Sequence, residues 1–265
     1  MFTLYIKAPF QSTFSVKTNC KSLASVLQLW FGRYISFSEK PADFSIRATF
    51  QKSTYKIQAS DFNCSTKSPL HTIHDYIFEH VRYGNSVLAL HGAAVSWNGS
   101  AYLFLAATTG GKSTLAAYLS AKGFGYLTDD CILLDRNTLH IHPYPKPIHL
   151  RPGGYQVLEK YECAPACTCS GTASDRRFIY TPENTVDTAL PLAHIYFIKR
   201  TEHENQTMAM DTTERIFELM KAPAVVYPIN GEYLRLLASI SGIPCSRLQY
   251  SSLNYITDTI KKERN

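Results

Sequence analysis

The sequence lacks any run of roughly 18 consecutive apolar residues, the length at which a segment is typical of a membrane-spanning helix. The stretch from Met1 to Lys7 also lacks the basic region followed by an apolar region that marks a secretory signal. We therefore expect no membrane partner and a cytoplasmic location. Low-complexity segments and internal repeats are missing as well. The 265 residues, 45% of them hydrophobic and 18% charged, favour one large α/β domain, with or without a smaller appendage.

The sequence lacks evenly spaced cysteines, and its seven cysteines form an odd number. This pattern predicts reduced thiols rather than a disulfide framework. Cys163, Cys167 and Cys169 do cluster, and three cysteines can begin a zinc site. No fourth ligand follows at metal-finger spacing, and the segment is rich in Ala, Ser, Thr and Gly. We expect a flexible loop that carries incidental thiols.

Acidic residues are few in the first part of the chain. Residues 1–90 carry ten Lys or Arg against five Asp or Glu, whereas residues 91–265 carry seventeen against sixteen. Nearly all of the net charge of +6 therefore lies in the N-terminal part. The lysines are scattered singly, without aromatic interleaving, so we expect no nucleic-acid partner. Such a part can receive an acidic peptide, although a solvated surface is the usual meaning of this bias.

The order of patterns divides the chain into an N-terminal α+β lobe, residues 1–85, and a larger domain, residues 86–265. In the lobe, apolar residues at helical spacing predict helices around residues 23–30 and from Ser68 to Gly84. Alternation in residues 44–50 and 55–59 predicts a β-hairpin. The lobe is the part in which we expect a peptide to dock.

The larger domain alternates strand and helix signals. Residues 87–95 predict one buried strand with His91 in its middle, and prolines and glycines after residue 140 predict a loop-rich region. Further strands are expected near residues 101–107, 125–128, 178–181, 194–199 and 246–250, and helices near 113–121, 213–220, 232–241 and 253–262. This order predicts an α/β domain built on a mainly β-sheet with flanking helices.

One motif carries most of the functional information. An apolar run from Leu103 leads into Gly110-Gly111-Lys112-Ser113, which matches the end of the phosphate-binding P-loop pattern GxxxxGK[ST]. Ala106 stands where that pattern asks for its first glycine. Backbone amides of the loop can still converge at the start of the helix, whose positive dipole end favours polyphosphate. The candidate nucleotide-binding residues are Thr108, Thr109, Gly110, Gly111, Lys112, Ser113 and Thr114.

These residue types fit a nucleoside triphosphate with its magnesium ion. Lys112 would neutralise the β and γ phosphates, and the Ser113 hydroxyl would ligate Mg²⁺. The strand that ends at Thr128 delivers Asp129 and Asp130 to the same edge of the sheet. One carboxylate can accept a proton from an attacking hydroxyl while the other orders the metal ion. His91 is either a core residue or a group that trades protons near neutral pH.

Three of these elements together resemble the catalytic C-terminal domain of HPr kinase/phosphorylase: Leu-His91-Gly with its strand pair, Gly110 to Ser113, and Asp129-Asp130 seventeen and eighteen residues after Lys112. The segments from Lys146 to Gly153 and from Pro191 to Arg200 are more like the shortened relatives found beside peptide-modifying gene clusters. Those relatives include kinases that phosphorylate lasso peptide precursors. The resemblance covers about residues 70–255 and implies an HPr-kinase-like P-loop fold.

The resemblance also implies roles for individual residues. Asp129 would be the general base that accepts the proton of a seryl hydroxyl. His91 would be its partner near the transferred phosphoryl group. Asp130 would help Ser113 to hold the metal ion, in place of a glutamate that this chain lacks. The family's Glu-Ile-Arg-Gly segment is absent, which argues against HPr as the acceptor and against phosphorolysis. Arg151, Arg176 or Arg177 would supply the missing positive charge, and nothing in the sequence chooses among them.

The leading hypothesis is an ATP- and Mg²⁺-dependent kinase that phosphorylates a serine of a peptide or small protein, with a lasso peptide precursor as the favoured acceptor. Three alternatives stay open: an HPr-type protein serine kinase, a small-molecule P-loop kinase and an inactive nucleotide-binding scaffold. A eukaryotic-type protein kinase is excluded because the His-Arg-Asp and Asp-Phe-Gly motifs are absent. Assembly of several copies is also left open.

Overall fold

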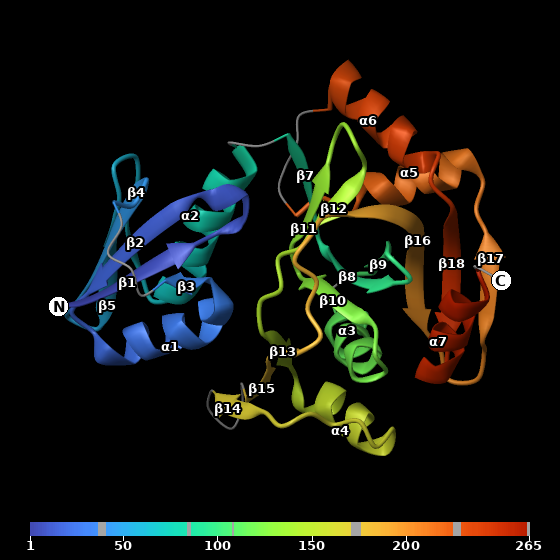
Figure 1. Cartoon of the computed structure of the whole chain (residues 1–265), viewed down its shortest axis with the longest axis horizontal. Coiled ribbons are helices and arrows are strands. Elements are labelled where there is room, and N and C mark those ends of the chain that lie inside the picture. The colour runs from blue at the N-terminus through green and yellow to red at the C-terminus, as the bar shows by residue number, and fades with distance from the viewer. Residues whose placement is uncertain (37–40, 84–85, 108, 171–175, 225–228, 264–265) are drawn as a thin grey trace. The chain divides into compact units, whose positions relative to one another are not determined.

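The computed structural model describes residues 1–36, 41–83, 86–107, 109–170, 176–224 and 229–263. Its internal contacts divide the chain into two compact units, Met1–Ser86 and Val87–Asn265. Each unit has its own sheet, and Figure 1 shows the elements of both. The chain is a mixed α/β protein, as the sequence predicts.

The N-terminal unit is a six-stranded sheet with two helices (Figure 1). The strands follow the order β3-β1-β2-β4-β5-β6. Their bounds are β1 (Phe2–Lys7), β2 (Thr13–Thr18), β3 (Ile35–Ser36), β4 (Phe44–Gln51), β5 (Thr54–Gln58) and β6 (Asn63–Thr66). The helices are α1 (Lys21–Phe31) and α2 (Pro69–Tyr83), with short 3-10 turns η1 (Pro9–Gln11) and η2 (Gly32–Tyr34).

Alternation in β1 and β4 gives this sheet one buried apolar face. Leu4, Ile6, Val16 and Ile46 are almost wholly buried on the side of α1 and α2, while the residues between them in β1 and β4 point the other way. The predicted β4–β5 hairpin is confirmed, with Phe50 opposite Tyr55. Both predicted helices are confirmed as well, and the predicted stop of the second helix at Gly84 lies outside the described residues. Strand β2 was not predicted, although it lies between β1 and β4 in the centre of the sheet.

The C-terminal unit is a nine-stranded sheet that branches at β16. The path β10-β8-β9-β16-β12-β11-β7 is joined by β18, which pairs with β16 and with β17. The bounds are β7 (Val87–Leu90), β8 (Gly92–Trp97), β9 (Ser100–Leu105), β10 (Gly125–Asp129), β11 (Ile132–Asp135), β12 (His140–His142), β16 (Leu190–Arg200), β17 (Gln206–Ala209) and β18 (Cys245–Tyr250). Strands β13 (Ile148–Leu150), β14 (Thr168–Ser170) and β15 (Arg177–Tyr180) form a separate small sheet.

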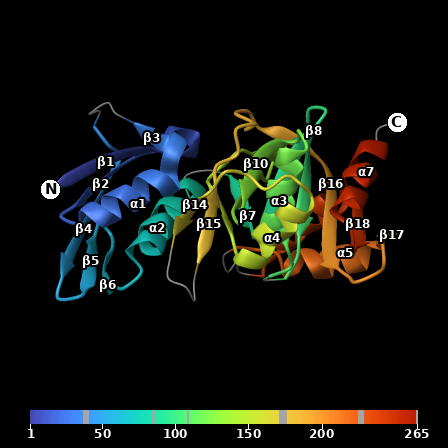
Figure 2. The same cartoon turned by 90° about the horizontal axis from the view of Figure 1, so that it is seen from below.

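Helices cover both faces of the central strands, as Figure 2 shows from below. They are α3 (Lys112–Ala121), α4 (Pro152–Lys160), α5 (Thr212–Met220), α6 (Gly231–Ser241) and α7 (Leu253–Lys262). Tyr102 and Phe104 of β9 pack in the core of α3 and α7, whereas Leu103 and Leu105 pack in that of α5 and α6. Burial on both faces explains why β9 is apolar without alternation.

Two predictions about this unit are wrong. The expected strand of residues 87–95 is interrupted at His91, because β7 pairs with β11 while β8 turns to pair with β9 and β10. The region after residue 140 is not mainly loop, since it contains β12, β13 and α4. Pro152 begins α4, where a missing N–H costs nothing, and the glycine pair falls in the first turn of the helix.

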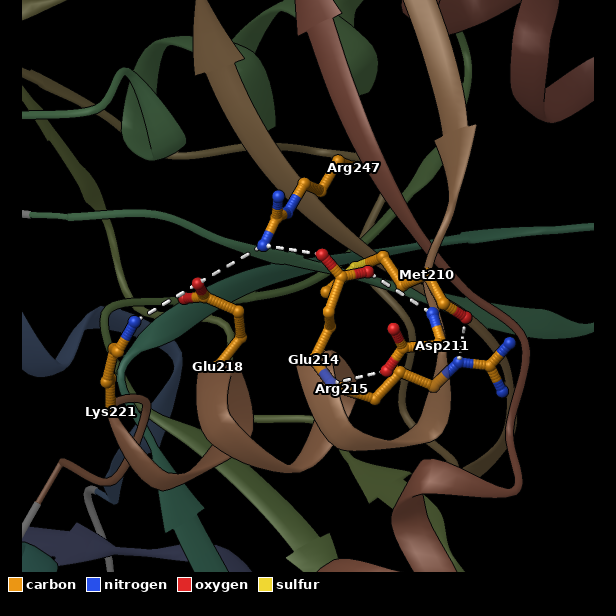
Figure 3. A network of polar contacts seen from close by, with 7 residues as sticks. All are labelled: Met210, Asp211, Glu214, Arg215, Glu218, Lys221 and Arg247. Carbon is orange, nitrogen blue, oxygen red and sulfur yellow. Dashed lines mark hydrogen bonds and ion pairs between the residues drawn. The ribbon is translucent and has the colours of Figure 1, made fainter.

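Polar contacts anchor α5 to its neighbours (Figure 3). Asp211 caps the helix by accepting a hydrogen bond from the Glu214 amide at 2.9 Å. Arg215 donates to the carbonyl of Ser241, at the end of α6, at 3.0 Å, and Arg247 of β18 forms an ion pair with Glu214 at 3.3 Å. These contacts hold α5 and α6 together in the layer that packs on one face of β9 and β18.

Disulfide bonds join none of the seven cysteines, all of which lie in the described ranges. The predicted loop around Cys163, Cys167 and Cys169 contains strand β14, which includes Cys169. Within the described residues, no group of three or more His, Cys, Asp or Glu side chains is placed to hold a metal ion. Among the described helices, none combines the length and the apolar character needed to cross a membrane.

Candidate functional site

The P-loop leads from β9 into α3 through two left-handed residues. Gly111, which precedes α3, has a φ of 87°, a conformation that favours glycine. Thr109 has a φ of 67°, and strained residues of this kind cluster at binding sites. The Gly110 amide donates to the Ala107 carbonyl at 3.0 Å, which closes a tight turn. The loop therefore ends at a helix N-terminus, where amide groups and the helix dipole favour an anion.

The loop accommodates Ala106 in place of the first glycine of the pattern. A Cβ atom at position 110 would lie 2.6 Å from the Cβ of Ala106 and 2.9 Å from the carbonyl oxygen of Ala107. Neither distance is tolerable for a real side chain. The turn can therefore close over Ala106 only because Gly110 has no side chain.

Lys112 is buried inside the loop that it follows, with only 6% of its surface exposed. Its Nζ donates hydrogen bonds to the carbonyl oxygens of Ala106 at 2.9 Å and Ala107 at 3.3 Å. Burial lowers the pKa of Lys112, while the charges of Asp129 and Asp130 act in the opposite direction. The carbonyl groups of Ala106 and Ala107 therefore hold the ammonium group inside the loop.

Asp129 lies at the same edge of the sheet as the P-loop. Its strand β10 runs antiparallel to β8, which runs antiparallel to β9, so β9 and β10 end at the same side. The side chain is 4% exposed, and its Oδ1 has no hydrogen-bond partner among the described residues. Burial and the charge of Asp130 raise the pKa of Asp129 to about 7, although Ser113, Lys146 and Lys112 act to lower it.

The His91 ring contacts the backbone of Asp130. Asp130 is exposed and has a φ of 70°, and its carbonyl oxygen lies 3.2 Å from Nδ1 of His91. The His91 amide donates to the Ala222 carbonyl at 2.7 Å, which holds the bend between β7 and β8. Burial, followed by the charge of Lys112, lowers the pKa of the His91 imidazole. At neutral pH this ring is therefore uncharged.

The structure brings five predicted side chains into one neighbourhood. Each of them interacts with another member by a hydrogen bond or by its charge: His91, Lys112, Ser113, Asp129 and Asp130. The predicted loop residues Thr109, Gly110, Gly111 and Thr114 flank them along the chain. Thr108, also predicted to bind nucleotide, lies outside the described residues.

Lys146 is a member of this neighbourhood that sequence reasoning missed. Its side chain is 6% exposed, its Nζ lies 3.8 Å from Sγ of Cys131, and it stands 5.2 Å above the ring of Tyr144. Among the cations that lower the pKa of Asp129, Lys146 has a larger effect than Lys112. A hydrogen bond from the Tyr126 hydroxyl to the Lys146 carbonyl, 2.9 Å long, fixes the segment beside β10.

The available signal for Lys146 was its place between Pro145 and Pro147. Two prolines stiffen an extended segment, so a lone lysine between them is held in position. None of the three arginines considered as sources of charge is buried: Arg151 and Arg176 are exposed, and Arg177 is half-buried in the small sheet. Lys146 supplies the second buried cation instead.

Two further contacts shape the wall of the P-loop. A Cβ atom at Gly111 would lie 2.9 Å from the hydroxyl of Tyr250, at the end of β18. A Cβ atom at Gly154, in the first turn of α4, would lie 2.5 Å from Oγ1 of Thr114. The end of β18 therefore packs closely on the loop at Gly111. The start of α4 packs closely on the first turn of α3 at Thr114.

Comparisons with known proteins give a likeness in structure without a match in sequence. No family model matches the chain, and no curated protein matches it. Among solved structures, the chain is similar to the Hpr(Ser) kinase/phosphatase from Coxiella burnetii, with 10% sequence identity and a TM-score of 0.33. The match covers 67% of this chain and 99% of that one.

Proposed function

We propose that this protein is an ATP- and Mg²⁺-dependent kinase that transfers the γ-phosphoryl group to a seryl hydroxyl of a peptide. The observation that carries the proposal is the buried carboxyl group of Asp129, with an unpartnered Oδ1, beside the lysine and hydroxyl of a P-loop. A polyphosphate site alone explains the loop, Lys112 and Ser113. It does not explain a carboxyl group held at a pKa near neutral pH beside them.

The side chains of the site fit magnesium and nucleotide by their chemistry. The Ser113 hydroxyl and the exposed Asp130 carboxylate are the oxygen ligands that Mg²⁺ prefers, and they would hold it. When bound, the ion neutralises charge on the phosphate oxygens. The loop amides from Thr109 to Thr114 and the Lys112 ammonium would bind the phosphates of ATP.

Asp129 would act as the general base in this proposal. Its Oδ1 would accept the proton of the seryl hydroxyl as the oxygen attacks the γ-phosphorus of ATP and ADP leaves. A base with a pKa near 7 is well matched to neutral pH. Neutral His91 would accept a hydrogen bond or a proton near the reacting groups. Lys146 would keep part of the Asp129 population ionised, because its charge lowers the pKa of that carboxyl.

We further propose that the acceptor is a serine in a lasso peptide precursor. Support comes from the absent Glu-Ile-Arg-Gly segment, from the likeness of residues 146–153 and 191–200 to kinases of such precursors, and from the basic N-terminal unit. The experiment is mass spectrometry of candidate precursors incubated with the protein, ATP and Mg²⁺. A gain of one phosphate on serine is expected, whereas efficient labelling of HPr alone would overturn the peptide assignment.

Two substitutions separate binding from transfer. Lys112→Ala should abolish transfer and weaken ATP binding, since its ammonium group is the cation within the loop. Asp129→Asn should keep ATP binding and slow turnover about 100-fold to 10,000-fold, the usual contribution of a general base. Lys160→Ala and Asp258→Asn, both at exposed positions, are the matched controls. ATP binding without any transfer in the unaltered protein would favour a nucleotide-binding scaffold instead.

A further inference from the structure

The outer face of the N-terminal sheet, the side away from α1 and α2, carries charge of one sign. Residues paired across strands share a face, so the registers of Lys17 with Arg47 and of Thr49 with Lys56 place these three cations on it. Lys7 joins them through its pairing with Thr13, in the alternation that leaves Leu4 and Ile6 buried. All four cationic side chains are exposed.

No acidic residue occurs in any of the six described strands of this sheet. The remaining outer positions carry Ser, Thr, Asn and Gln side chains and the single aromatic ring of Tyr5. Among the described residues that flank these strands, Asp43, just before β4, accepts hydrogen bonds from the amide and hydroxyl of Thr13 at 2.8 and 2.7 Å. Asp43 is therefore engaged at one end of the sheet and does not neutralise its centre.

Lys17 and Arg47 stand directly opposite each other on the parallel strands β2 and β4. Neighbouring strands lie about 4.8 Å apart, and like charges at that separation destabilise a sheet. An anionic partner would relieve this repulsion. Strands β2 and β4 are the two central strands of the sheet, so a partner that crosses the strands would meet both charges.

We propose that the outer face binds an extended, acidic stretch of polypeptide and so docks the peptide that the protein phosphorylates. Only the identity of that polypeptide as the acceptor rests on the proposed function. Carboxylates would pair with the four cations, with Arg47 able to bind one in a two-pronged manner, and the serine, threonine and amide side chains would bond its backbone. A single-stranded nucleic acid fits less well, because stacking needs several aromatic rings and this face has Tyr5 alone.

The test measures binding to the full chain by fluorescence anisotropy in low salt and without ATP. The probe is a labelled synthetic peptide of alternating Glu and Ser, and its neutral counterpart alternates Gln and Ser. The Glu peptide should bind and the Gln peptide should not. Replacing Lys17→Ser and Arg47→Ser together should weaken binding about tenfold, since two exposed ion pairs are lost.

The matched control removes the same charge elsewhere in the unit. Lys21→Ser with Lys67→Ser changes two exposed lysines at the starts of α1 and α2 and should alter affinity less than about twofold. Equal losses in both double variants, or tighter binding of an oligothymidylate that displaces the Glu peptide, would overturn the proposal. Thermal unfolding of each variant confirms that it is folded.

One more arm separates the docking surface from the kinase activity. Lys112→Ala should bind the Glu peptide as the unaltered protein does, because Lys112 is not one of the four cations of this face. Normal peptide binding without phosphoryl transfer to any acceptor would remove the proposed function and leave the surface. Transfer that is unaffected by the Lys17 and Arg47 substitutions, with no Glu-peptide binding, would remove the surface and leave the function.

Discussion

Asp129 shows how burial prepares a single residue for chemistry. A carboxyl group taken out of water favours its neutral form, and an unpartnered oxygen leaves part of its hydrogen-bonding capacity unused. Folding tolerates this cost because the group sits among Lys112, Lys146 and Ser113, each of which favours the ionised form. Strongly perturbed pKa values of this kind are typical of functional sites.

At the residue scale, we predict that Asp129→Asn stabilises the protein more at pH 8 than at pH 4. The folded pKa of about 7 lies above the ordinary value of 3.8, so the folded state binds a proton that the unfolded state releases between these values. Stability of the unaltered protein therefore falls as pH rises through this window, by about 1.4 kcal/mol per pKa unit. Melting temperatures at both pH values measure the difference, and an equal change at pH 4 and pH 8 would contradict the raised pKa.

We also predict that Lys146→Met moves the acidic limb of the pH–rate profile to higher pH. Lys146 lowers the pKa of Asp129, whereas burial and the charge of Asp130 raise it. Without Lys146 this pKa rises further, so we expect the acidic limb to move up by about one pH unit. Initial rates of transfer between pH 5 and pH 9 test this. Lys160→Met, which removes an exposed charge, should leave the limb in place. A lower rate with an unmoved limb would show that Lys146 does not act through Asp129.

At the element scale, helix α4 is packed so closely on α3 that a side chain at position 154 requires Thr114 or the helix to shift. We predict that Gly154→Ala weakens ATP binding, because its Cβ would come within 2.5 Å of Oγ1 of Thr114 and displace that hydroxyl or the helix. Gly153→Ala is the matched control, since nothing lies within 4 Å of its added Cβ. There alanine should be neutral or stabilise the helix by up to about 1 kcal/mol. Titration with a fluorescent ATP analogue compares the two, and equal affinities would refute the packing argument.

Elements differ in how far their patterns could predict them. Helices α2, α5 and α7 have apolar stripes and start signals such as Pro69, so local sequence predicted them. Helix α4 begins Pro-Gly-Gly, which is typical of a turn, and it becomes helical where Leu158 is buried against the core of α3. The break at His91 was hidden because β7 and β8 are both apolar and only their different partners separate them.

At the scale of the whole molecule, the two units have separate hydrophobic interiors and separate proposed tasks. We predict that residues 87–265 expressed alone bind ATP but lose affinity for the Glu peptide. The P-loop, Asp129 and Lys146 all lie in that fragment, whereas the outer face lies in residues 1–86. Equilibrium binding of both ligands to the fragment and to the full chain tests the division. Retained affinity for the Glu peptide would show that the surface lies elsewhere.

Local chemistry in the sequence predicts the P-loop residues and the aspartate pair as site residues, and the α/β class that it also predicts is confirmed. Glycines, a lysine and a hydroxyl at fixed spacing act through the backbone of one short loop, so their roles can be inferred without distant contacts. Asp129 could be predicted in the same way, because it follows directly on a buried strand. Its pKa could not, since burial and neighbouring charges depend on residues far along the chain.

Only the tertiary structure decided which distant residues join that loop. Lys146, Tyr250 and Gly154 reach the site because β10, β18 and α4 are packed beside α3, and no periodicity in the sequence encodes those pairings. The basic outer face has the same origin. The sequence showed an excess of positive charge in residues 1–90, but strand register decided that Lys17 and Arg47 stand side by side with no acid between them. The alternation of side chains along one strand can be predicted from local sequence. Which strand pairs with it, and in which register, depends on residues far along the chain.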